Sequence, residues 1–168
     1  YRYTHDGSET TSDSFTYKAN DGALDSSVVT VAITVTAVND APLAVADVIT
    51  VAEGGTATTL SGDVASVLAN DTDVDSSELT AVLVDGPANG SLTLNANGTF
   101  SYVHDGFETT SDSFTYKAND GDLDSGVVTV AVTVVPVNDA PLAVADVITV
   151  AEGAQVDAAS VLVNDTDA

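Results

Sequence analysis

Apolar and polar residues alternate with a period of two along several short stretches of the chain. The stretch Val127–Val134 consists of Val, Thr and Ala in alternation, and β-branched residues with this period favour a strand with one buried face. In a neighbouring stretch, Phe114, Tyr116 and Ala118 fall on one side of an extended chain, with polar residues between them. Both stretches are therefore predicted to be strands of a half-buried sheet.

Further short strands and turn signals fill the region before these two strands. The polar segment Asn95–Gly98 ends in Asn-Gly between two apolar stretches, which predicts a β-hairpin. Strands are predicted at Val45–Ala52, Thr56–Leu60, Leu79–Val84, Ser91–Leu94 and Thr99–Val103, and a helical turn is conceivable only at Val64–Ala69. This density of short strands predicts an all-β, immunoglobulin-like two-sheet sandwich, with a barrel as the alternative.

The chain also repeats itself. Residues 3–54 match residues 102–153 at 45 of 52 positions with an offset of 99, and after a shortening of five residues the match resumes, with Asn70–Asp73 returning as Asn164–Asp167. A period of this length is that of an independently folding domain and exceeds that of a solenoid repeat. We therefore expect a linear array, in which 41–140 is one complete repeat, 1–40 the back part of a preceding repeat and 141–168 the front part of a following one.

The charge balance excludes several classes of partner. The chain has 26 Asp and Glu against 3 Lys and Arg, a formal net charge of −23, and it has no Cys. Nucleic acid and anionic membrane surfaces need clustered cations, so neither is expected as a partner. Without Cys there is no disulfide, zinc–thiolate site or thiol nucleophile. No apolar run approaches the ~20 residues of a membrane-spanning helix, so membrane insertion is not expected.

The acidic residues are concentrated in loops and are mostly Asp, with 21 Asp and 5 Glu. They gather at 70–75, at 119–124 and at the junction 137–141, which repeats 38–42. Several carboxylates around one point repel unless a cation neutralises them, and Ca²⁺ with its six to eight oxygen ligands suits such loops best. An EF-hand is excluded because Ser76 and Val82 stand where that loop needs Gly and Glu. The simpler interpretation is that the Asp residues only cap turns and keep the chain soluble.

Four motifs together resemble the bacterial cadherin-like tandem repeats of large surface and secreted adhesins. They are the junction Val137–Pro141, the segment Val67–Asp73, the segment Gly86–Leu92 and the segment Asp112–Tyr116. The resemblance covers the whole chain. It implies cadherin-like Greek-key sandwiches, extended arrays, Ca²⁺ at domain junctions and an adhesive or spacer role.

The resemblance also implies a set of metal ligands at two junctions. At the first junction the matching residues are Asn39 and Asp40 of the linker, Asp71, Asp73 and Asp75 of the following loop, and Asp120 of the late Ala-x-Asp-Gly segment. At the second junction Glu53 would meet Asn138, Asp139, Asp165 and Asp167. Ala37 and Pro136 stand where the family has a linker aspartate, so one or two ions are expected at each junction.

Three functions from different classes follow from these observations. The leading hypothesis is a calcium-stiffened extender repeat of a bacterial cell-surface or secreted adhesin, with neighbouring repeats and cell-surface glycans or proteins as partners. The first alternative is a filament subunit in which the incomplete end segments, 1–40 and 141–168, of identical subunits complement each other. The second is a carbohydrate-binding or halophilic acidic sandwich. An enzyme is not expected, because His5 and His104 have no recurring nucleophile beside them and are better explained as turn or strand-end residues.

Overall fold

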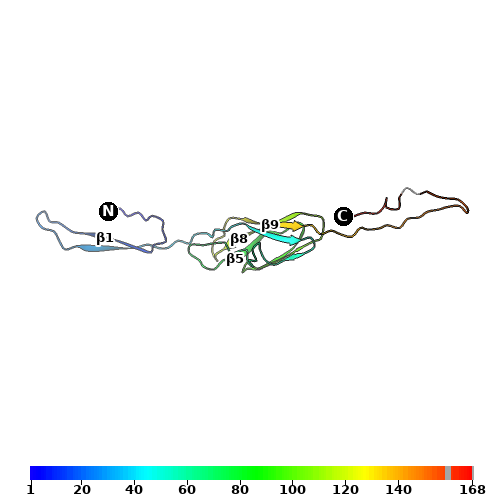
Figure 1. Cartoon of the computed structure of the whole chain (residues 1–168). Helices are drawn as coiled ribbons and strands as arrows, with labels where there is room; N and C mark the ends of the chain where they lie inside the picture. The colour runs from blue at the N-terminus through cyan, green and yellow to red at the C-terminus, as the bar shows by residue number, and fades with distance from the viewer. Residues whose placement is uncertain (158–159, 168) are drawn as a thin grey trace.

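The computed structural model of the chain describes residues 1–157 and 160–167, and these fold as an all-β protein without helices (Figure 1). The strands form a four-stranded sheet, a three-stranded sheet and a separate two-stranded sheet. In the described part no helix is long and apolar enough to cross a membrane. The all-β class predicted from the alternating pattern is confirmed.

The two larger sheets belong to the central unit. The four-stranded sheet has the order β3 (Asp47–Ala52), β9 (Val128–Val135), β8 (Ser111–Asn119) and β5 (Thr80–Asp85). Within it β3 runs parallel to β9, whereas the other pairs are antiparallel. The three-stranded sheet has the order β4 (Thr56–Ala57), β7 (Phe100–His104) and β6 (Gly90–Leu94), and its pairs are antiparallel. The chain crosses between these sheets after β3, β4, β5 and β7, as in a sandwich with Greek-key connections.

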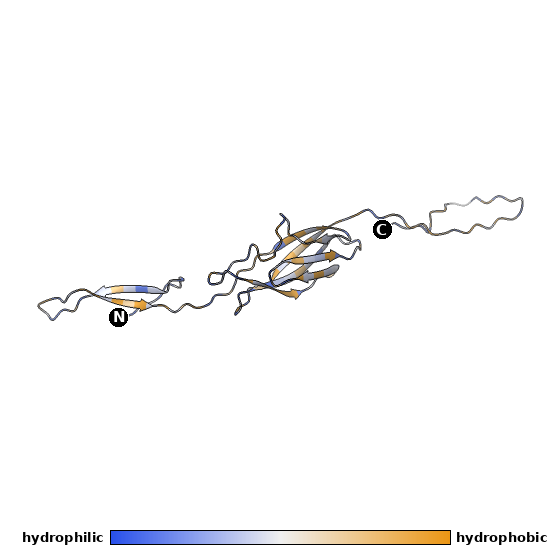
Figure 2. Cartoon of the chain, turned by 90° about the horizontal axis from the view of Figure 1, so that it is seen from below, coloured by the Kyte–Doolittle hydropathy of each residue, from blue (hydrophilic) through white to orange (hydrophobic). Residues whose placement is uncertain are grey.

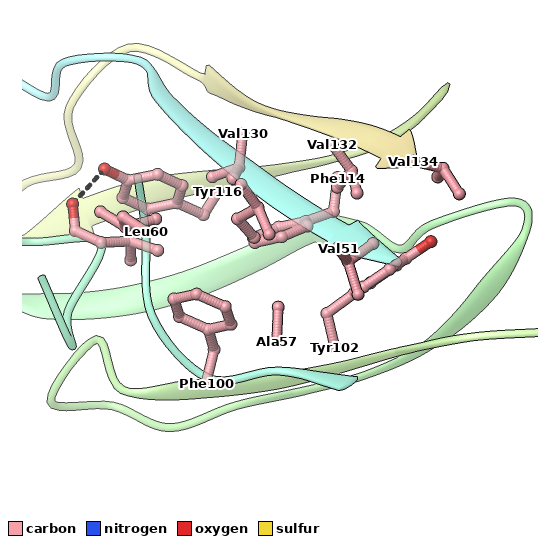
Figure 3. Close-up of a cluster of buried hydrophobic side chains, with 12 residues drawn as sticks. Val51, Ala57, Leu60, Phe100, Tyr102, Phe114, Tyr116, Val130, Val132 and Val134 are labelled. Atoms are coloured by element: carbon pink, nitrogen blue, oxygen red, sulfur yellow. Dashed lines mark hydrogen bonds between the residues drawn. The ribbon is translucent and has the colours of Figure 1, made fainter. Parts of the chain in front are cut away.

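The core lies between the two sheets, as Figure 3 shows. The four-stranded sheet contributes alternate residues of β8 and β9, including Phe114, Tyr116, Val130 and Val132, all at most 2% exposed. Tyr102 of β7 faces them and is fully buried. Each such side chain contributes about 1.5–3 kcal/mol when removed from water. No strand pair joins the two sheets among the described residues, so the arrangement is a sandwich and the barrel alternative is not supported.

Most predicted strands occur close to their expected positions, but one is shorter. Of the stretch Thr56–Leu60, only Thr56–Ala57 forms a strand, while Leu60 bridges to Val64 in a turn. The stretch Val64–Ala69 forms turns without a helix. The predicted hairpin is confirmed, and its Gly98 has a φ of 79°; a Cβ there would collide with Ser66 Oγ. Glycine meets both constraints at no steric cost.

The two end segments of the chain lie on either side of the central unit (Figures 1 and 2). Residues 1–40 contain a hairpin-like pair of antiparallel strands, β1 (Ser12–Tyr17) and β2 (Val29–Thr34). In the last segment, a bridge between Leu142 and Thr166 brings the start of the segment next to its end. The domain boundaries at 40 and 140 remain predictions, and residues 158, 159 and 168 of the last segment lie outside the described residues.

Candidate functional site: acidic clusters at the two junctions

Three carboxylates from separate parts of the chain meet where the central unit joins the following segment. Glu53 directly follows β3, Glu108 lies in the loop between β7 and β8, and Asp139 follows β9. One oxygen from each lies within 4.8 Å of the others. The backbone N–H of Glu53 donates to Val135 O at 2.9 Å, which continues the parallel β3–β9 pairing to this edge. We call Glu53, Glu108 and Asp139 the exit cluster.

Within the described residues, no Lys, Arg or His forms an ion pair with a carboxylate of the exit cluster. Glu53 Oε2 accepts a hydrogen bond from Val137 N at 3.1 Å, whereas Oε1 is shielded from solvent and has no partner among the described residues. The negative charge of Glu53 is the largest cause that raises the pKa of Glu108, followed by desolvation, the charge of Asp139, a side-chain hydrogen bond with Glu53 and the charge of Asp167. Carboxylates gathered in this way are hard oxygen donors for a divalent cation.

The buried side chain of His104, the last residue of β7, connects the two loops that carry Glu53 and Glu108. Its Nδ1 accepts hydrogen bonds from Gly54 N and Gly106 N, both at 3.2 Å. Its Nε2 pairs with Thr109 Oγ1 at 2.7 Å. Because Gly54 is next to Glu53 and Thr109 is next to Glu108, the imidazole fixes the spacing of the two loops. The strand-end position predicted for His104 is confirmed.

A related cluster lies where the first segment joins the central unit. Asp40 N donates to Asp75 Oδ2 at 2.7 Å. The negative charge of Asp75 is the largest cause that raises the pKa of Glu9, followed by burial, a side-chain hydrogen bond with Asp75 and the charge of Asp40. Asp73 Oδ1 accepts from Asp75 N and Ser76 N, while its Oδ2 is shielded and has no partner among the described residues. We call Glu9, Asp40, Asp73 and Asp75 the entry cluster.

The repeat relates the two clusters residue by residue. With the offset of 99, Glu9 corresponds to Glu108 and Asp40 to Asp139, and after the five-residue shortening Asp73 corresponds to Asp167. The same kinds of carboxylate therefore gather at both junctions.

Asp71 and Asp165 form hydrogen bonds within their own unit or segment and do not reach across a junction. Asp71 Oδ1 accepts from Val45 N at 2.8 Å and its Oδ2 accepts from the Tyr116 hydroxyl at 3.0 Å. Asp165 Oδ1 likewise accepts from Val144 N at 2.8 Å. Both oxygens of Asp71 thus fix the loop onto the strand that carries Tyr116, and the structure gives this residue a bracing role inside the unit.

Asp120 and the linker asparagines contribute mainly to the geometry of the backbone. Asp120 Oδ1 accepts from Asp122 N and Leu123 N at 2.7 Å, and its Oδ2 accepts from Asn39 Nδ2 at 2.8 Å. The backbone hydrogen bonds, with that of Asn39, lower the pKa of Asp120 and keep it ionised. Asn138 donates instead to Asp139 O at 2.9 Å.

Sequence reasoning missed two ligand candidates and one buried carboxylate. Glu9 and Glu108 were missed although a glutamate recurs three residues after the Asp of each Asp-Gly turn, at Asp6 and Asp105. Because the chain has only 5 Glu, the return of a glutamate at the same position of the repeat could have marked both residues as ligand candidates. Asp47 was missed because it occupies a strand position with no acidic motif. Burial raises the pKa of Asp47 to about 6, although hydrogen bonds from Tyr116 and Asn70 act in the opposite direction.

Comparison with known proteins supports the same family. No curated protein matches this chain. Among solved structures, two endo-fucoidan hydrolases of glycoside hydrolase family 107 are similar: MfFcnA4 at 17% identity and TM-score 0.37, and MfFcnA9 at 19% and 0.34. The alignments cover 75% of this chain but only 19% and 22% of those chains, and similarity at this level carries no argument about function. The model of the bacterial cadherin-like domain matches residues 39–136, more than half of the chain, so this protein belongs to the bacterial cadherin-like domain family.

Proposed function

We propose that the chain is a calcium-stiffened spacer of an extracellular bacterial adhesin, in which a cation at each junction restrains one unit against the next. The observation that carries this proposal is the exit cluster. Its Glu53 and Glu108 come from loops that follow β3 and β7, whereas Asp139 lies in the linker that follows β9 at the end of the central unit. A cation held by all three links the unit to the chain that follows.

The residues fit Ca²⁺ in chemistry and in charge. The cluster offers carboxylate oxygens only, and Glu53 Oε1 is a shielded oxygen for which no protein donor exists among the described residues. Asp167 lies near enough to raise the pKa of Glu108 and is a further ligand candidate. Ca²⁺ accepts six to eight oxygens in flexible geometry, whereas Mg²⁺ demands an octahedron of shorter bonds. Carboxylates from separate loops therefore favour Ca²⁺.

Cation binding would control stiffness through electrostatics. Without a cation, the like charges of Glu53, Glu108 and Asp139 repel, and the segment that carries Asp139 is free to move away. When a dication is bound, the same three carboxylates are attracted to it and are held together. Extracellular modules bind Ca²⁺ with Kd of about 10⁻⁴–10⁻³ M, so external calcium could set the stiffness of the array. Neither cluster has the nucleophile and base pair that covalent catalysis requires, and we propose a structural role without enzymatic activity.

Titration calorimetry and small-angle scattering test this function. The chain should bind Ca²⁺ more tightly than Mg²⁺, and Glu108→Gln should remove the binding assigned to the exit cluster. Glu78→Gln is the matched control. Glu78 is exposed and lies outside both clusters, and its substitution removes the same charge as Glu108→Gln. In millimolar Ca²⁺ the largest dimension of the chain should be better defined than in chelator. Identical titrations for the wild type and Glu108→Gln would contradict the proposal.

A further inference from the structure

One aromatic side chain of the central unit projects into solvent. Residues 41–140 contain five aromatic residues, of which four are at most 4% exposed, namely Phe100, Tyr102, Phe114 and Tyr116. Phe107, in the loop between β7 and β8, is 71% exposed. Because aromatic rings contribute much of the binding energy at protein interfaces, an exposed ring on a fixed loop is a candidate anchor for a partner.

Hydrogen bonds fix the backbone around Phe107, and the ring is not needed for this. Phe107 N donates to Asp105 Oδ1 at 3.1 Å, and at the equivalent position of the first segment Ser8 N donates to Asp6 Oδ1 at 3.0 Å. The glycine that precedes each of these two residues has a φ of 84°. Since the same loop forms with a serine, its fold does not require the ring of Phe107.

Further apolar residues lie near Phe107 where the two copies of the repeat differ. The copies differ at seven of 52 aligned positions, and three of these differences place Phe107, Val135 and Pro136 where the first segment has Ser, Thr and Ala. Those Ser, Thr and Ala residues line one hollow of the first segment. In the central unit Val134 N donates to Thr110 O at 3.0 Å, which holds the loop of Phe107 beside the end of β9 in the same way.

These apolar residues form an accessible surface, which we call the exit patch and define as Phe107, Val135, Pro136 and Val137. Val135 and Val137 are 47% and 46% exposed, and Pro136 is exposed as well. At the other junction the central unit follows the equivalent residues 8 and 36–38, and all four remain exposed there. A following unit therefore leaves these positions accessible, and the exposure of the patch belongs to the central unit and its linker.

Carboxylates border the exit patch. Asp105 and Glu108 flank the aromatic residue in its loop. Glu53 lies against the linker, because its N–H donates to Val135 O at 2.9 Å and its Oε2 accepts from Val137 N at 3.1 Å. Among the described residues, no Lys or Arg forms an ion pair with these three carboxylates. The patch thus combines an apolar centre with a negative border.

This combination favours a cationic partner over a neutral one. Ionised carboxylates only accept hydrogen bonds, and Lys and Arg donate charge-assisted hydrogen bonds to them. Sugar hydroxyls are neutral, and they need donors as well as acceptors from a protein. The chain also carries a formal net charge of −23, which attracts a cationic partner over a longer distance.

We propose that the exit patch binds a protein segment in which an apolar side chain is flanked by Lys or Arg. The apolar side chain packs on the ring of Phe107 and on Val135, while the cations pair with Asp105 and Glu108. Aromatic residues at the centre of an interface commonly carry most of the binding energy, and charges at its border set specificity. The equivalent surface of the first segment has Ser8 in place of the ring and binds such a segment more weakly.

Calcium competes with this partner, and this part rests on the proposed function. A cation at the exit cluster neutralises Glu53 and Glu108, which border the patch. The basic segment then loses part of its electrostatic attraction. Binding of the segment should therefore be strongest in the absence of calcium.

Fluorescence anisotropy with two labelled peptides tests the proposal on the 168-residue chain. The peptides are Arg-Arg-Leu-Leu-Arg-Arg and Arg-Arg-Ser-Ser-Arg-Arg, which carry equal charge and differ only in the apolar centre. In chelator and about 0.15 M salt, the wild type should bind the leucine peptide about tenfold more tightly than the serine peptide. Phe107→Ser installs the residue of the first segment and should remove this difference.

Leu24→Ser is the matched control. Leu24 is 75% exposed in the loop between β1 and β2, and its substitution also replaces one exposed apolar side chain by serine. This variant should bind both peptides like the wild type. Equal binding of the two peptides by the wild type overturns the proposal, as does equal binding of the leucine peptide by the wild type and Phe107→Ser. Dimers of the wild type that Phe107→Ser abolishes in sedimentation velocity assign the patch to a second copy and overturn the proposal as well.

A calcium titration separates this proposal from the proposed function. Phe107→Ser should bind Ca²⁺ like the wild type, because the ring is not a ligand. Millimolar Ca²⁺ should weaken the binding of the leucine peptide to the wild type by about fivefold. An unchanged peptide affinity in Ca²⁺ overturns the competition. If the wild type binds no Ca²⁺, the proposed function fails, while the contrast between the two peptides in chelator still decides the exit patch.

Discussion

Glu108 faces Glu53 across the junction with carboxylate oxygens no more than 4.8 Å apart, and this proximity raises the pKa of Glu108. The two residues come from loops at the same edge of the sandwich, one after β3 and one after β7. His104 holds these loops together through Gly54, Gly106 and Thr109. Because His104 holds both loops, the two carboxylates cannot easily move apart to relieve their repulsion. A bound cation would remove this repulsion and so stabilise the folded unit.

Removal of calcium should lower the melting temperature of the central unit. At 10 mM Ca²⁺ and a Kd of about 10⁻⁴–10⁻³ M, binding at one site stabilises the folded state by about 1.4–2.7 kcal/mol. For a unit of this size the melting temperature should rise by roughly 5–20 °C. Calorimetry in Ca²⁺, in Mg²⁺ and in chelator measures the difference. Equal melting temperatures in all three would contradict the prediction.

Truncation of His104 should weaken calcium binding although the residue is not a ligand. His104→Ala removes the acceptor that holds Gly54 N and Gly106 N and should lower the affinity of the exit cluster about 10-fold to 100-fold. His104→Asn keeps an acceptor near the Nδ1 position and should retain more of the affinity than His104→Ala.

The matched control is His5→Ala. His5 keeps the hydrogen bonds to Gly7 N and Thr10 Oγ1, but its side chain is 24% exposed and it lies in the first segment, outside the exit cluster. Its substitution should leave the titration of the exit cluster unchanged. Equal affinities for His104→Ala and the wild type would show that the loops hold their spacing without the imidazole.

The central unit should become less stable as the pH rises through 6 in the absence of calcium. Burial raises the pKa of Asp47 from its ordinary value to about 6, so the protonated form is favoured in the folded state. Stability from this group is fully present below about pH 4 and is lost as the pH rises through about 6, a loss of roughly 2–3 kcal/mol. Denaturation in chelator from pH 4.5 to 7.5 measures it.

Asp47→Asn should remove this pH dependence. The amide keeps an acceptor for Asn70 Nδ2, and its own N–H can donate to the Tyr116 hydroxyl. At pH 7.5 the variant should be more stable than the wild type, and the two should converge near pH 4.5. An Asp47→Asn variant with the pH profile of the wild type would assign the dependence to another group.

Loss of the Tyr116 hydroxyl should destabilise the unit, because this hydroxyl links the core to the acidic loop. It donates to Val67 O at 2.7 Å and lies 3.0 Å from Asp71 Oδ2. Tyr116→Phe leaves these acceptors unsatisfied and should cost about 1–3 kcal/mol. Tyr17→Phe, at the exposed counterpart, should change the stability by less than about 0.5 kcal/mol. Urea denaturation of both variants measures the contrast, which would vanish if the hydroxyl were dispensable.

The sequence alone determined the strands, the hairpin and the repeating unit. The alternation of Val and Thr in 127–134 and the Asn-Gly turn are patterns within short segments, and the 99-residue repeat is found by aligning the sequence with itself. The concentration of Asp in loops is likewise a pattern of the sequence alone. Tertiary structure decided which carboxylates meet. Glu108 joins Glu53 because the ends of β3 and β7 lie at one edge of the sandwich, whereas Asp71, although part of an Asp-x-Asp motif, is held by Val45 and Tyr116. Such proximity depends on how sheets pack across the core, and a period of two along one strand carries no information about it.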